Sequence, residues 1–76
     1  MPNGINNWTY KDVATFLKKR GFNLSRVKGS HHHYYGFYDK KLRVVTVPYH
    51  TKKAIVPRTM NSIIKQSGIS KKEWVG

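Results

Sequence analysis

The sequence predicts an α+β fold, in which two helices of one small domain pack on one face of a three-stranded antiparallel sheet. Two segments with apolar residues at helical spacing stand near the two ends of the chain, and three strand-like runs lie between them. Each helix has one apolar stripe, so packing both on the same sheet face buries both stripes. The opposite face of the sheet is then left open to solvent or to a partner.

Length and composition limit the chain to one hydrophobic core. With 76 residues there is no room for a second core, and we expect a loosely ordered lead-in over 1–8 followed by the domain over 9–76. No cysteine is present, which excludes a disulfide scaffold and a thiolate site. The sequence has no signal-like apolar segment and no run that could span a bilayer, so a cytoplasmic location is expected.

The first helix is predicted over 10–20. Thr9 is the expected N-cap, because Asp12 follows three positions later and completes a carboxylate variant of the capping box. Trp8 and Val13 occupy the two positions of a hydrophobic staple around this cap. The apolar stripe then repeats at i, i+3 and i+4 in Val13, Phe16 and Leu17.

Three runs in the middle of the chain predict an antiparallel meander. They cover 22–28, 31–38 and 42–47, with a polar hairpin loop over 39–41. In the first run, alternation predicts that Phe22 and Leu24 lie on an inward face. Gly36 in the second run indicates a β-bulge or the close approach of another backbone.

The second helix is predicted over 57–67, after a connecting loop over 49–56. Its first residue is a proline, which suits a first helical turn, and Gly68 is a typical stop signal. Ser70 followed by Glu73 fits a second capping box, after which only a single helical turn can follow.

Charge is the strongest compositional signal. Fifteen Lys and Arg residues face three acidic residues, which gives a formal net charge of +12. The cations are spread along the whole chain, and this favours a folded nucleic-acid-binding domain over a basic tail. A membrane-surface protein and a merely soluble basic protein are the alternatives, although no segment combines a broad apolar helical face with a basic one.

The turn and histidine run over 28–33 is the expected centre of the chemistry. A Gly-Ser pair supplies a tight bend, and the three imidazoles that follow can exchange protons near neutral pH. A purification tag and ordinary strand histidines are the alternatives. We expect no metal and no cofactor, because alternate strand residues point to opposite faces and His32 could not join His31 and His33.

A histidine beside a lysine suits cleavage of an RNA backbone. RNA carries its own nucleophile, the 2′-hydroxyl, so an enzyme need only remove its proton, protonate the leaving 5′-oxygen and stabilise charge on the phosphate. We expect His31 to act as general acid or base without a metal ion, while Lys28 and Ser30 contact the phosphate.

The stretch from Asp12 to Ser70 contains three short motifs in order: GF-x-L-x-R-x-KGSHH, VTVP-x-H and SIIKQSGIS. Together they resemble the HicA family of small bacterial toxins. The resemblance implies a fold like the double-stranded-RNA-binding domain, a stress-response toxin that cuts mRNA, and neutralisation by a HicB antitoxin. The family's functional histidine is the first one after Gly-Ser, which is His31 here. His50 falls on the VP-x-H position, where a supporting role is possible. The chain departs from the family pattern in its longer lead-in and in its third consecutive histidine.

The expected RNA contacts lie at the turn and on the strands and loops on either side of it: Arg26, Lys28, Gly29, Ser30, Lys40, Lys41, Arg43 and His50. The aromatic residues of 31–38 cannot all be core, so some are candidates for base stacking or for a protein interface. Two other functions stay open, a non-catalytic RNA-binding module of the same shape and a protein-interaction module that docks a partner on the open sheet face.

Overall fold

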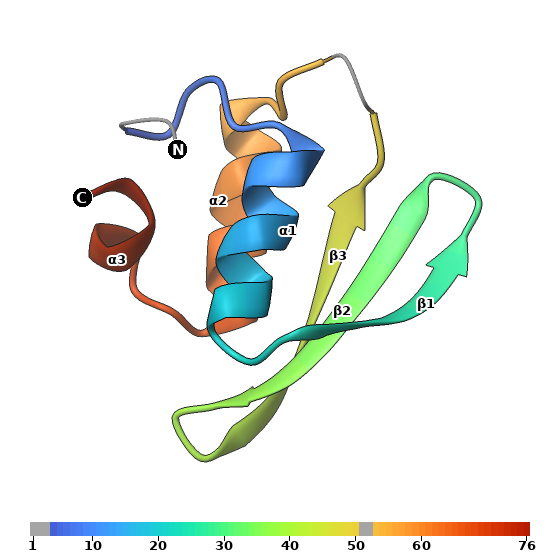
Figure 1. The fold of residues 1–76 in the computed structure, drawn as a ribbon. Helices are drawn as coiled ribbons and strands as arrows, with labels where there is room; N and C mark the ends of the chain where they lie inside the picture. Colours follow the sequence, from blue (N-terminus) through green and yellow to red (C-terminus); the bar gives the residue numbers. More distant parts are fainter. Residues whose placement is uncertain (1–3, 51–52) are drawn as a thin grey trace.

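The computed structural model describes residues 4–50 and 53–76 and confirms the α+β architecture (Figure 1). Helices α1 and α2 lie on one face of a sheet whose strands follow the order β1-β2-β3, with both pairs antiparallel. A short third helix, α3, follows α2. The elements are α1 (Tyr10–Lys19), β1 (Asn23–Lys28), β2 (His31–Tyr38), β3 (Lys41–Pro48), α2 (Pro57–Ser67) and α3 (Lys71–Val75).

Both hydrogen bonds of the capping box predicted at Thr9 are present. The Asp12 N–H donates to Thr9 Oγ1 at 3.3 Å, and the Thr9 N–H donates to Asp12 Oδ2 at 3.0 Å. Trp8 and Val13 are both fully buried, as the hydrophobic staple requires. The helix ends one residue earlier than predicted, with Arg20 as its C-cap, because the glycine that follows turns the chain with a φ of 87°.

Two tight hairpin turns connect the strands. Gly29 and Ser30 form the first, where the φ of 59° at Gly29 is one that other residues rarely adopt. Asp39 and Lys40 form the second, and their φ values of 52° and 64° are typical of a type I′ turn, whose twist fits a hairpin. Because this turn needs only two residues, Lys41 already belongs to β3, and the predicted three-residue loop is one residue too long.

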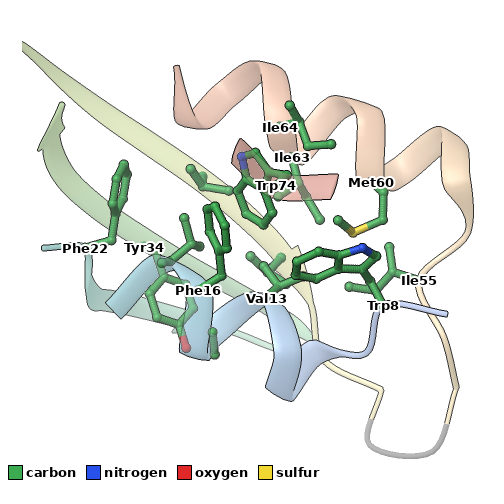
Figure 2. Packing of buried hydrophobic residues seen from close by; sticks show 14 of the residues in the cluster. Trp8, Val13, Phe16, Phe22, Tyr34, Ile55, Met60, Ile63, Ile64 and Trp74 are labelled. Carbon is green, nitrogen blue, oxygen red and sulfur yellow. The ribbon is translucent and has the colours of Figure 1, made fainter. Parts of the chain in front are cut away.

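Register and burial place the core between the helices and the two strands β2 and β3. Tyr34 pairs with Val45, and both side chains are fully buried on the helix-facing side. Their neighbours Tyr35 and Val44 also pair, but they are 45% and 54% exposed on the opposite face. That face is therefore open, as predicted. The core, drawn in part in Figure 2, consists of Trp8, Val13, Ala14, Phe16, Leu17, Phe22, Tyr34, Val45, Val47, Ile55, Met60, Ile63, Ile64, Ile69 and Trp74.

Strand β1 lies outside the layer that the helices cover. Leu24 pairs with Tyr34 and so lies on the helix-facing side, but it stays 45% exposed, and the prediction of a buried inward face is wrong for this residue. All six residues of β1 are exposed, because α1 and α2 lie over β2 and β3 (Figure 1). Phe22, just before the strand, is fully buried as predicted.

Gly36 marks a close approach of the chain and not a bulge. Its pairing with Arg43 is regular, and the irregularity of the sheet lies instead between Leu24 and Arg26 in β1. A Cβ atom at Gly36 would lie 2.8 Å from Cγ of Phe22 and 3.0 Å from its Cα. The second of the two predicted roles of this glycine is therefore the correct one.

Helix α2 has the predicted bounds, and Gly68 ends it with a left-handed φ of 73°. The predicted further turn is α3, with Ser70 as its N-cap residue. The capping box predicted there is wrong, because the Ser70 side chain makes no capping hydrogen bond. The Glu73 carboxylate instead accepts a hydrogen bond from the Tyr38 hydroxyl at 2.8 Å. Trp74 is buried and stacks on Phe16, and this contact anchors α3 to the core.

The lead-in and the connecting loop meet at Trp8. The indole N–H of Trp8 donates to the Gly4 carbonyl at 2.8 Å, and the Trp8 carbonyl accepts from the Ile55 N–H at 2.6 Å. The division into a lead-in over 1–8 and a domain over 9–76 stays a prediction, and residues 1–3 and 51–52 lie outside the described residues. Within the described part of the chain, no helix combines the length and the apolar character needed to cross a bilayer.

Replacing Gly36 by alanine tests the close approach to Phe22. The added Cβ has to displace the ring or the backbone of Phe22, and overpacking of this kind costs about 1–3 kcal/mol. We expect urea unfolding to show this loss, whereas Val44→Thr on the open face should change stability by less than about 0.5 kcal/mol. An unchanged free energy of unfolding for Gly36→Ala would contradict the close packing of Gly36 on Phe22.

Candidate active site at the Gly-Ser turn

The turn between β1 and β2 holds the predicted catalytic histidine at one end of the sheet. Lys28 and His31 form the last cross-strand pair before the turn, with Gly29 and Ser30 between them. The Ser30 carbonyl accepts a hydrogen bond from the Tyr49 N–H at 2.7 Å. The turn is thus held on one side by the β1–β2 ladder and on the other by the chain that leaves β3.

The three consecutive histidines point to two different faces of the sheet. His32 pairs with Val47, which is fully buried on the helix-facing side, so His32 lies on that side as well. His31 and His33 alternate with it and lie on the open face. The expectation that His32 cannot join the other two is confirmed. Among residues 4–50 and 53–76, no group of three His, Cys, Asp or Glu side chains could hold a metal ion.

Two cations share the open face with His31 and His33. Lys28 pairs with His31 and Arg26 pairs with His33, so each imidazole has a cation as its cross-strand neighbour. His31, Lys28 and Arg26 are exposed, and His33 is partly buried. This group, which we call the histidine face (Arg26, Lys28, His31 and His33), is open to a polyanion from solvent.

The acidic residues of the chain lie away from the histidine face. Asp12 is engaged in the cap of α1, and Glu73 on α3 is bonded to Tyr38. Asp39 belongs to the hairpin at the other end of the sheet. Since these are the three carboxylate side chains of the sequence, none competes with a phosphate on the strands near the turn.

The ring of His33 is fixed by hydrogen bonds that lead back to α2. His33 Nδ1 and Thr46 Oγ1 lie 3.0 Å apart and are hydrogen-bonded across β2 and β3. The N–H of Thr46 donates to Gln66 Oε1 at 2.8 Å, so a side chain from α2 pairs with the outer edge of β3. Because Nδ1 is occupied, Nε2 is the ring nitrogen of His33 that remains for a ligand.

His32 belongs to a cluster of tyrosines on the helix-facing side. The Tyr10 hydroxyl is hydrogen-bonded to His32 Nδ1 at 2.9 Å and to the Tyr34 hydroxyl at 2.5 Å. The His32 ring stacks on Tyr49 with centroids 4.6 Å apart. Burial, first, and the hydrogen bond to Tyr34, second, raise the pKa of Tyr10 above its ordinary value. This cluster ties α1 to the strand that carries the catalytic candidate.

A groove of about 450 Å³ lies beside the tyrosine cluster. Its basic residues are Lys11 and Lys18, which stand seven positions apart on α1, and no motif in the sequence pointed to them. The residues that line it are Tyr10, Lys11, Ala14, Thr15, Lys18, Tyr34 and Tyr49.

The other predicted RNA contacts do not gather around His31. Lys40 and Lys41 lie at the far hairpin, and the eight residues of β2 place roughly 23 Å between the two ends of the strand. Arg43 lies on the helix-facing side, where its guanidinium packs against Gly68 and its Nε–H donates to the Tyr38 carbonyl at 3.4 Å. His50 follows Tyr49, and it lines a second groove of about 280 Å³.

The aromatic residues of β2 divide between the two faces. Tyr34 is core and Tyr38 is partly buried against α3, whereas Tyr35 and Phe37 lie on the open face. There they pair with Val44 and Leu42, and Phe37 is 72% exposed. We call this group the apolar face (Tyr35, Phe37, Leu42 and Val44); it occupies the end of the open face away from the histidine face.

Comparison with known protein families identifies a family that contains this chain. A family model described as the HicA toxin of bacterial toxin–antitoxin pairs matches residues 10–69. The chain belongs to the HicA toxin family. Membership makes it a toxin of the kind that is paired with an antitoxin. Comparisons with curated proteins and with solved structures give no match, so the likeness to the double-stranded-RNA-binding domain stays a prediction.

Replacing Tyr10 by phenylalanine tests the cluster that holds His32. The variant leaves His32 Nδ1 and the Tyr34 hydroxyl without this partner, so we expect a loss of about 1–3 kcal/mol in urea unfolding near neutral pH. An unchanged stability at this pH would contradict a structural role of the hydroxyl.

The difference in stability between the wild type and Tyr10→Phe should depend on pH. The pKa of Tyr10 is raised on folding, so above about pH 10 the residue ionises in the unfolded chain while it stays neutral in the folded one. This linkage destabilises the wild type as the pH rises, and Tyr10→Phe does not have it. The difference in stability between the two proteins should therefore shrink between about pH 9 and pH 11. A constant difference over this range would contradict the raised pKa.

Proposed function

We propose that the chain is a metal-independent endoribonuclease that cuts mRNA, with His31 as its general acid or base. The observation that carries this proposal is the position of His31, exposed at a fixed turn beside Lys28, on a sheet face without carboxylates. Imidazole is the side chain that most often acts as general acid or base, and cations beside it suit a phosphodiester substrate. Family membership supports the toxin role, the geometry of the site supports cleavage of an RNA backbone, and the choice of mRNA as substrate follows from the resemblance to the HicA family.

The reaction we propose uses the 2′-hydroxyl of the substrate as nucleophile. This oxygen bonds to the neighbouring phosphorus and loses its proton, while the bond from phosphorus to the 5′-oxygen breaks and that oxygen gains a proton. His31 transfers one of these protons, a role worth typically about 10²–10⁴-fold in rate. Lys28 stabilises the negative charge that grows on the phosphate oxygens.

The proposed RNA contacts fall into two groups. Arg26, Lys28, Gly29 and Ser30 lie at the turn, where they can meet the phosphate that is cut or its direct neighbours. Lys40 and Lys41 are too distant for that phosphate and would contact only an RNA that extends along β2. We include Arg43 and His50 as weaker contacts, because the first is held against α2 and the second lies beyond β3.

We also propose a HicB-type antitoxin as partner and the cytoplasm, where mRNA is translated, as the setting. The open face presents cations at one end and apolar side chains at the other, which favours a protein with matching acidic and apolar surfaces. The exposed apolar face is also the observation that favours the second candidate function, a protein-interaction module without catalysis.

His31→Gln is expected to abolish RNA cleavage while it leaves folding and RNA binding nearly unchanged. Glutamine preserves a polar, exposed side chain but cannot transfer a proton near neutral pH. The measurement is cleavage of a mixed RNA by wild type and variant in excess EDTA, with binding measured at low salt. Equal cleavage by both proteins would remove His31 from the mechanism. Salt-sensitive binding without cleavage by the wild type would favour a non-catalytic RNA-binding module.

Induced expression in bacteria tests the toxin–antitoxin role. We expect the wild type to stop growth, His31→Gln to be tolerated, and co-expression of the antitoxin gene encoded beside it to restore growth. Growth arrest by the variant at equal protein level would contradict toxicity through RNA cleavage.

A further inference from the structure

We propose that His33 is the general acid that completes an acid–base pair with His31. This inference rests on the proposed function, because it assigns the second proton transfer of the same cleavage reaction. Two observations carry it. The register places both imidazoles on the open face, and the ring of His33 is fixed through Nδ1 by Thr46.

The spacing of the two histidines suits the geometry of the reaction. Residues two apart on a strand share one face and lie roughly 6.6–6.8 Å apart along the chain. In an in-line displacement the attacking 2′-oxygen and the leaving 5′-oxygen stand on opposite sides of the phosphorus. A base and an acid must each come within about 2.6–3.2 Å of one of these oxygens. Two rings on neighbouring same-face positions can therefore serve both oxygens of one phosphate.

The hydrogen bond to Thr46 allows His33 to hold and to release a proton at Nε2. In the protonated ring both nitrogens are donors, and Thr46 Oγ1 accepts from Nδ1–H. After Nε2 has given up its proton the same bond persists, so the ring keeps its orientation through the step. Gln66 of α2 holds the Thr46 backbone in turn.

The cations of β1 provide a place for the phosphate between the two rings. Lys28 stands opposite His31 and Arg26 stands opposite His33, and all four belong to one face of two adjacent strands. A phosphate centred on this group would meet a cation on either side. His32 cannot take the role of either histidine, because it lies on the other face with its Nδ1 bonded to Tyr10.

The two histidines transfer the two protons of the cleavage reaction. His31 accepts the proton of the 2′-hydroxyl as the 2′-oxygen bonds to phosphorus, and His33 donates the proton of Nε2 to the 5′-oxygen as its bond to phosphorus breaks. The products are a 2′,3′-cyclic phosphate and a free 5′-hydroxyl. His31 ends protonated and His33 neutral, and exchange with water restores both. No oxidant, reductant or metal ion enters this balance.

The test uses an RNA in which sulfur replaces the bridging 5′-oxygen at a site that the wild type is first shown to cut. A thiolate leaves without being protonated, so a missing general acid matters little for this substrate. We expect His33→Gln to lose about 10²–10⁴-fold on the oxygen substrate and to lie within about tenfold of the wild type on the sulfur substrate. The matched variant His31→Gln, which removes the base, should fail on both.

Two outcomes would overturn the assignment of His33, and a third would overturn the proposed function on which it rests. If His33→Gln cleaved the oxygen substrate at the wild-type rate, His33 would not be needed for the reaction. An equal loss on both substrates would assign it to binding or structure. Failure of His31→Gln to lose activity on either substrate would instead overturn the proposed function. Thr46→Val supplies a second variant, since removing the hydroxyl leaves His33 in place; we expect a smaller loss on oxygen and again recovery on sulfur. Thermal unfolding of each variant confirms that it is folded.

Discussion

The alternation of side chains along β2 is the constraint on which the site depends. Tyr34 is buried in the core and bonded to Tyr10 of α1, and this fixes the face that every other residue of the strand takes. His32 shares the buried side with Tyr34, while His31 and His33 point the other way. A slip of one residue would expose Tyr34 and turn both open-face imidazoles toward the helices. The hydrophobic core therefore decides which histidines lie on the open face of the sheet.

Features that depend on neighbours in sequence could be predicted, and features that depend on distant partners could not. The capping box at Thr9 and the bounds of α2 follow from short local patterns, and the structure has both. Leu24 fits an alternating strand pattern, but its exposure depends on how far the helices extend over the sheet. Ser70 fits a capping box, but its expected partner Glu73 bonds to Tyr38, which comes from another part of the chain. No local pattern contains either fact.

The candidate site also combines features that a local pattern predicts with features that depend on distant partners. A short motif placed His31 at a turn beside Lys28, and the structure has this arrangement. Charge alone also selected Lys40 and Lys41, although they lie at the far end of a long strand, because composition carries no information about distance along a sheet. The hydrogen bond between His33 and Thr46 could not be predicted from the sequence either, because it depends on the cross-strand register between β2 and β3.

The histidine face and the apolar face, which occupy the two halves of the open face, suit different kinds of ligand. The histidine face suits phosphates, but the exposed side chains of the apolar face offer nothing to an RNA backbone. Burying those apolar side chains releases water and stabilises a complex in proportion to the area covered. In the proposed toxin, RNA would gain mainly from the cationic half, whereas a protein with acidic and apolar surfaces would gain from both. The proposed antitoxin would therefore compete with RNA for the open face through apolar contacts as well as through charge.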